Sequence, residues 1–82
     1  MDIRIERLDN GNYIASYVDT SGEKPTLKYI GEETDAEHRA LKKAIDFLEE
    51  RGLERGDEIM ETYGIIHHYT GSRWRVDHVS GY

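Results

Sequence analysis

Cysteine is absent from this 82-residue chain, proline occurs once, and there is no long run of apolar residues. Without cysteine the protein has no disulfide, no zinc–thiolate site and no thiol nucleophile. A transmembrane helix needs about 20 consecutive apolar residues, and the opening residues Met-Asp-Ile-Arg-Ile-Glu-Arg-Leu do not have the form of a signal peptide. We therefore expect one cytoplasmic domain over residues 1–82, with no membrane association.

Acidic residues are the feature present in excess. The chain has 17 acids and 11 Lys or Arg, for a formal net charge of -6. Residues 31–61 alone hold 11 acids and 5 bases. The formal net charge of residues 1–30 is -1, and that of residues 62–82 is +1. Nucleic-acid binding normally requires a basic track, because counterion release from phosphates drives it. Direct nucleic-acid binding is therefore disfavoured and a basic protein partner is favoured, with a merely solubilising acidic surface as the alternative.

The segment 34–52 predicts an amphipathic helix. Thr34 is expected to be the N-cap, with Glu37 reaching back to the N–H of Thr34 in a capping box. Gly52 supplies the residue that ends the helix. Apolar residues recur at three- and four-residue spacing and predict one packed face, made of Ala40, Leu41, Ala44, Ile45 and Leu48.

Three strands are expected before this helix. Residues 3–8 alternate apolar and charged side chains, and Asp9-Asn10-Gly11-Asn12 then forms a tight turn. Residues 13–18 are rich in aromatic and β-branched residues, and Pro25 marks the start of a strand over residues 26–30. The pattern predicts three antiparallel strands followed by one helix that crosses them.

After the helix, residues 58–69 are strand-like with an interruption at Gly64, and residues 73–79 alternate again. The predicted fold is α+β in the order β-β-β-α-β-β, an antiparallel sheet packed on one amphipathic helix. A two-residue loop at Gly71-Ser72 sets the register of the last hairpin. It places six side chains on the core face, which are Ile65, His67, Tyr69, Trp74, Val76 and His78. It places four on the opposite face, which are His68, Arg73, Arg75 and Asp77.

Few residues suit a cofactor or metal site. His67 and His68 are neighbours in a strand, so their side chains point to opposite faces and cannot chelate one ion. We expect no cofactor and no metal. If Asp9, Glu37 and Glu61 converged at the ends of neighbouring strands, they could bind Mg²⁺ or Mn²⁺. The cap role expected for Glu37 is the preferred interpretation.

A resemblance to a known family involves the same region. The segment 34–41 resembles the first helix of bacterial ribonuclease H proteins, which carry a Thr-Asn-Asn-x-Ala-Glu-Tyr-x-Ala-Leu type of segment. Glu61-Thr62 sits where that family has Asp-Ser, and residues 71–76 are similar to its Gly-x-Trp-Lys-Val stretch. The resemblance implies a ribonuclease H-like core with Asp9, Glu37 and Glu61 as the metal-binding carboxylates. The family's Asp-Gly-Ser is missing, and Glu61 replaces an aspartate.

A second resemblance implies binding without catalysis. Residues 3–19 are similar to the first hairpin of HicB-type antitoxins. Those proteins use a partial ribonuclease H-like fold to block a basic RNA-cleaving toxin. The hypothesis is therefore a small non-catalytic acidic module that engages a basic protein partner in the manner of an antitoxin or inhibitor. The alternative is a reduced divalent-metal ribonuclease H-type phosphodiesterase. Self-association through the edge of the last strand is also left open. The expected binding residues are Asp46, Glu49, Glu50, His68, Arg73 and Arg75.

Overall fold

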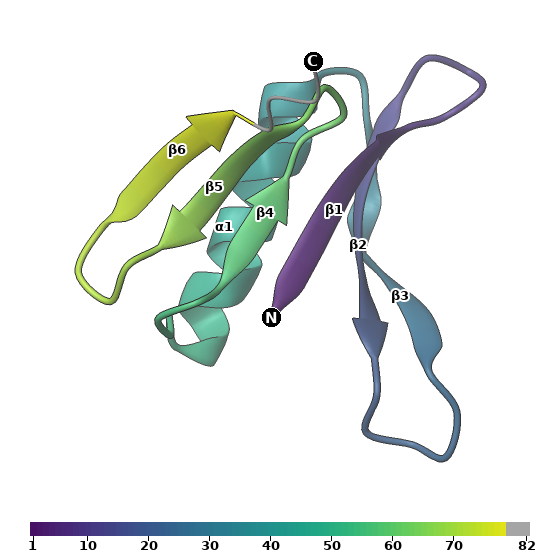
Figure 1. The fold of residues 1–82 in the computed structure, drawn as a ribbon. Coiled ribbons are helices and arrows are strands. Elements are labelled where there is room, and N and C mark those ends of the chain that lie inside the picture. Colours follow the sequence, from purple (N-terminus) through teal and green to yellow (C-terminus); the bar gives the residue numbers. More distant parts are fainter. Residues whose placement is uncertain (79–82) are drawn as a thin grey trace.

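A computed structural model of the chain describes residues 1–78. It is an α+β fold, as predicted, in which one helix packs on one face of a six-stranded sheet (Figure 1). The elements are β1 (Asp2–Arg7), β2 (Tyr13–Asp19), β3 (Thr26–Thr34), α1 (Glu37–Arg51), β4 (Glu58–Met60), β5 (Ile65–Tyr69) and β6 (Trp74–His78). The predicted strand end at Val79 lies outside the described residues.

The sheet is mostly antiparallel, in the order β3-β2-β1-β4-β5-β6. Its one parallel pair joins β1 and β4, where Ile3 lies beside Ile59 and Arg4 beside Met60. The prediction of a purely antiparallel sheet is wrong at this pair. Parallel neighbours need a long crossover connection, and here β2, β3 and α1 together provide it.

The segment 58–69 is two strands rather than one, so the predicted order β-β-β-α-β-β is also wrong. Gly64 has a φ of 84°, which favours glycine, and it lies in a tight turn. The N–H of Glu61 donates to the carbonyl of Ile65 at 2.8 Å, and the N–H of Gly64 donates to the carbonyl of Glu61 at 3.1 Å. The chain reverses there, and Ile66 pairs with Met60.

The predicted capping box is wrong. The helix begins at Glu37, and its N-cap is Ala36, which makes no side-chain cap. Thr34 instead belongs to β3, where it pairs with Tyr13, and its hydroxyl donates to the carbonyl of Ala36 at 2.9 Å. The pairing of Thr34 with β2 extends β3 beyond the expected residues 26–30 and delays the start of the helix.

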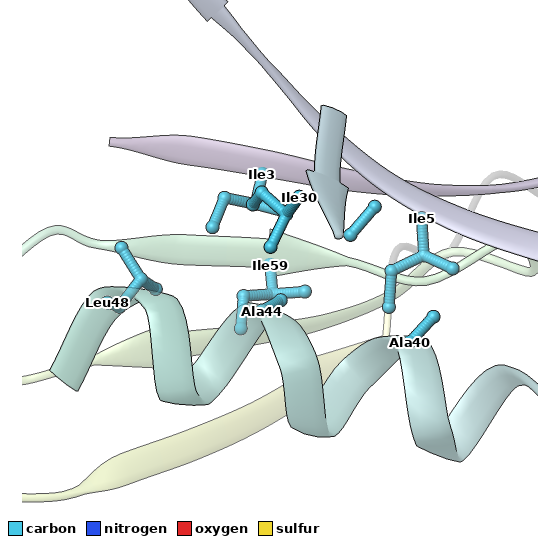
Figure 2. Close-up of a cluster of buried hydrophobic side chains, with 8 residues drawn as sticks. Ile3, Ile5, Ile30, Ala40, Ala44, Leu48 and Ile59 are labelled. Carbon is cyan, nitrogen blue, oxygen red and sulfur yellow. The ribbon is translucent and has the colours of Figure 1, made fainter. Parts of the chain in front are cut away.

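The apolar stripe of α1 is confirmed. Ala40, Ala44 and Leu48 are buried, whereas Leu41 and Ile45 are half-buried. Figure 2 shows Ala40, Ala44 and Leu48 of the helix facing the isoleucines of the sheet, which are Ile3, Ile5, Ile30 and Ile59. Fully burying one isoleucine contributes about 1.5–3 kcal/mol, so this layer is the main source of stability.

The register predicted for the last hairpin is confirmed, with Tyr69 opposite Trp74 and His67 opposite Val76. His67 also lies beside Ile59, so its side of the hairpin is the side that carries α1. The prediction that this whole face is core is wrong at its outer end, where Val76 is 53% exposed and His78 is exposed. The reason is that α1 makes its close contacts with β1, β2 and β3, whereas β6 lies at the edge of the sheet, where only Trp74 packs against the core.

A buried carboxylate fixes the start of β4. Asp57 is 5% exposed; it accepts a hydrogen bond from the ammonium of Met1 at 2.9 Å and another from the N–H of Glu54 at 2.9 Å. Burial raises the pKa of Asp57, but the Glu54 N–H and the Met1 ammonium together outweigh burial, so the pKa is lowered overall. The ionised form is therefore the one that the fold stabilises.

This lowered pKa predicts a pH-dependent stability. A carboxyl whose pKa is lower in the folded than in the unfolded state stabilises the fold fully above its unfolded value, and the contribution is lost as the pH falls through the folded value. Asp57→Asn should therefore reduce the free energy of unfolding at neutral pH by about 1–3 kcal/mol and flatten its decline in acid. Urea denaturation at a series of acidic pH values measures both effects. Glu23→Gln, in an exposed loop, is the matched control; parallel pH profiles for wild type and Asp57→Asn would contradict the role of Asp57.

Candidate functional site

The acidic helix surface consists of Asp46, Glu49 and Glu50 on the outer side of α1, and all three are exposed. Asp46 Oδ2 lies 3.0 Å from Lys42 Nζ one turn earlier, so its charge is partly compensated. Within residues 1–78, Glu49 and Glu50 form no ion pair. Two exposed carboxylates without an ion pair therefore follow one another in sequence near the end of a helix whose inner side is firmly packed.

A further acidic group lies near the start of the helix. Glu33 Oε1 accepts hydrogen bonds from Asn12 Nδ2 at 2.7 Å and Asn10 Nδ2 at 2.8 Å, which lower the pKa of Glu33. These bonds join the β1–β2 turn to the end of β3. A hollow of about 500 Å³ lies between this strand end and α1, and its lining is mostly charged: Glu33, Thr34, Asp35, Arg39, Lys42, Lys43 and Asp46.

The carboxylates of the metal hypothesis lie in two places. Glu37 Oε2 accepts a hydrogen bond from the N–H of Thr62 at 3.1 Å, so Glu37 and Glu61 share the edge where β4 ends. Glu61 Oε2 lies 2.7 Å from His67 Nε2, and both side chains are largely buried. Asp9 is exposed in the β1–β2 turn. Within residues 1–78 no three acidic or histidine side chains form a group that could hold a metal ion.

Glu37 has a structural role that the sequence did not predict. Its carboxylate does not cap Thr34; it ties the first residue of α1 to the backbone after β4. Beside it, the carboxylate of Glu61 and the imidazole of His67 form a hydrogen bond of 2.7 Å. A hollow of about 360 Å³ opens next to Glu61, and Arg4 and Arg7 contribute to its lining.

The remaining predicted binding residues lie on the opposite face of the sheet. His68 is opposite Arg75 in the β5–β6 pair, and Arg73 is exposed beside the connecting turn. Asp77 Oδ2 lies 2.7 Å from His68 Nε2 without hydrogen-bond geometry, and Arg75 Nε lies 3.6 Å from Asp77 Oδ1. The six predicted binding residues therefore do not form one site: three belong to the acidic helix surface, and three to the open face of the sheet.

The open face of the sheet also carries apolar side chains that the sequence analysis did not single out. Val18, Leu27 and Tyr29 are all more than half exposed on β2 and β3. Pairing places Val18 beside Leu27, and a hollow of about 340 Å³ extends from them to Met60. The signal was present in the sequence, because Ile14 and Val18 in β2 and Leu27 and Tyr29 in β3 are apolar although they alternate with the core positions.

Comparison of the chain with protein-family models, with curated proteins and with solved structures finds no match in any of the three. In residues 1–78, no helix has the length and hydrophobicity that crossing a membrane requires. The functional interpretation therefore rests on the charges, contacts and exposed surfaces described above.

Proposed function

We propose that this protein is a non-catalytic binding module that presents the acidic helix surface to a basic protein partner. The observation that carries the proposal is the pair Glu49 and Glu50, exposed and without an ion pair within residues 1–78. Charges on a packed helix are held in place before binding, which reduces the cost of ordering them. Complementary charge then speeds association and selects the partner.

The distribution of charge supports the same proposal. The segment 31–61 carries the whole net charge of -6, and α1 lies within it. An inhibitor or antitoxin that blocks a basic RNA-cleaving protein in the cytoplasm is one member of this class. The order of three strands, a helix and a further strand beside β1 supports a partial ribonuclease H-like arrangement of that kind.

Charge reversal at the end of α1 tests the proposal. Glu49→Lys/Glu50→Lys should weaken capture of a basic protein from host lysate at least about tenfold, because attraction becomes repulsion. The helix should remain folded, since cations are favourable near a helix C-terminus. Capture is quantified by pull-down with mass spectrometry, followed by titration of the purified partner at low and high salt.

The control is Asp9→Lys/Glu23→Lys, which changes the net charge equally at two exposed sites away from the helix. It should bind like wild type, apart from a small uniform effect of net charge. Equal loss in both double variants, or binding that neither charge reversal nor salt changes, would refute recognition by the acidic helix surface.

A reduced divalent-metal phosphodiesterase of ribonuclease H type is the second candidate. In its favour, Glu37 and Glu61 share one edge of the sheet, beside a hollow lined by Arg4 and Arg7. Glu37 and Glu61 would hold Mg²⁺ or Mn²⁺ there. The observed contacts of the two carboxylates do not suit a metal ion. The carboxylate of Glu37 already accepts a hydrogen bond from the Thr62 N–H, and that of Glu61 lies against the imidazole of His67. The binding module is therefore the better supported candidate.

Titration with Mg²⁺ or Mn²⁺ separates the two candidates. For the binding module, amide NMR signals of Asp9, Glu37 and Glu61 should show no saturable shift with Mg²⁺ and no selective broadening with Mn²⁺. A saturable response at Glu37 and Glu61 that Glu61→Gln abolishes would instead establish a metal site. Ca²⁺ serves as a control for non-specific binding to the acidic surface.

A further inference from the structure

The two edges of the sheet differ in how they are protected. β3 forms one edge; its pairing with β2 is irregular near Tyr13, and Gly31 there has a φ of 69°. Such irregularities and charged side chains discourage further strand pairing. β6 forms the other edge, and it is regular over Trp74–His78 with no proline or glycine. Within residues 1–78 nothing pairs with its outer side (Figure 1).

The free backbone groups of β6 can be assigned from the hairpin. The N–H of Thr70 donates to the carbonyl of Arg73 at 2.9 Å. Bonded and non-bonded pairs alternate along an antiparallel ladder, so Arg75 and Asp77 direct their backbone groups toward β5. Tyr69 lies opposite Trp74. Consistent with this alternation, its N–H points away from β6 and donates to the backbone carbonyl of Asp57 in the neighbouring segment. The outward backbone groups therefore belong to Trp74, Val76 and His78.

These outward groups are arranged symmetrically about Val76. We propose that β6 pairs antiparallel with β6 of a second copy of this chain, with the two-fold axis at Val76. Val76 then faces Val76 of the second copy, and Trp74 faces His78. All three residues on each strand form backbone hydrogen bonds, and Val76, now 53% exposed, becomes covered.

The side chains on the open face complement one another in this register. Arg75 and Asp77 alternate with the outward residues, so Arg75 of either copy faces Asp77 of the other. The dimer therefore contains two such pairs. These residues form non-hydrogen-bonded pairs, in which side chains lie closest. Within one chain Arg75 Nε lies 3.6 Å from Asp77 Oδ1, so both charged groups are already on the open face next to the free edge.

The neighbouring registers are disfavoured by the same two charges. Sliding one strand by two residues preserves the hydrogen-bonding pattern but leaves only two of the three outward residues of each β6 paired within β6. One slide places Asp77 opposite Asp77, and the other places Arg75 opposite Arg75 while Asp77 faces Arg73, which lies outside β6 beside the turn. Like charges directly opposite destabilise a strand pair. The full overlap of Trp74, Val76 and His78, together with two Arg75–Asp77 pairs and no pair of like charges, therefore favours the register centred on Val76.

Pairing of this kind extends the sheet through both copies. A two-fold axis perpendicular to the sheet keeps both copies of α1 on the same face, so two acidic helix surfaces face the same way. A partner with two basic sites would then bind with increased avidity. The dimer itself does not depend on the proposed acidic recognition, because α1 takes no part in the contact.

A charge-swap experiment tests the pairing and its register. Arg75→Asp alone and Asp77→Arg alone should each weaken the dimer about tenfold or more, because both facing pairs become repulsive. An equimolar mixture of these two variants should form a heterodimer, since every facing pair is again of opposite charge. Arg75→Asp/Asp77→Arg should restore the homodimer. Analytical ultracentrifugation distinguishes the 9.5 kDa chain from twice that mass, and circular dichroism verifies that each variant is folded.

Hydrogen exchange on the unaltered protein gives a second test that needs no variant. At high concentration the amides of Trp74, Val76 and His78 should become protected relative to dilute protein, whereas those of Arg75 and Asp77 should be protected in both. A wild-type chain that remains monomeric at high concentration overturns the proposal. A dimer whose stability is unchanged by the charge swaps also overturns it. So does a dimer in which the amides of Trp74, Val76 and His78 stay unprotected.

Discussion

The parallel contact between β1 and β4 is the constraint on which the rest of the structure depends. It joins β1–β3 to β4–β6, two antiparallel halves that share no other strand pairing in the part of the chain that the structure describes. Ile3 and Ile59 lie side by side in this contact, 2% and 0% exposed, beneath Ala44 and Leu48 of α1. Because this pair forms the centre of the sheet, β3 and β6 become its edges and α1 covers only one face.

This arrangement separates the surfaces that a partner can reach. The inner side of α1 is committed to the core, so its acids face solvent and hold a fixed pattern of charge. Glu37 ties the start of the helix to the segment after β4, and Asp57 ties the start of β4 to the segment that follows the helix. The helix is therefore anchored to the sheet near both ends, and binding at Glu49 and Glu50 requires little reordering of the backbone.

Local features were predictable from the sequence, and long-range ones were not. The packed face of α1 and the register of Tyr69 with Trp74 were predicted, because helical periodicity and a two-residue loop specify them locally. The parallel β1–β4 pair was missed, since residues 3 and 59 carry no local signal of their pairing. Glu37 was misassigned for the same reason: its partner, the N–H of Thr62, is 25 residues away in sequence. For the site, helical periodicity located the exposed acids of α1, and strand alternation placed His68, Arg73 and Arg75 on the face away from the core. The separation of these two groups was therefore already implied by the sequence, whereas the long-range contacts of Glu37 and Glu61 were not.

Native-state hydrogen exchange in Ile59→Ala tests most directly whether the β1–β4 contact holds the molecule together. Removing this fully buried side chain should lower the free energy of unfolding by about 2–5 kcal/mol, while Val18→Ala on the open face should change it little. We expect the slowest amides of β2 and β5 to lose protection equally in Ile59→Ala, because both halves unfold together. Loss of protection in one half alone would contradict it.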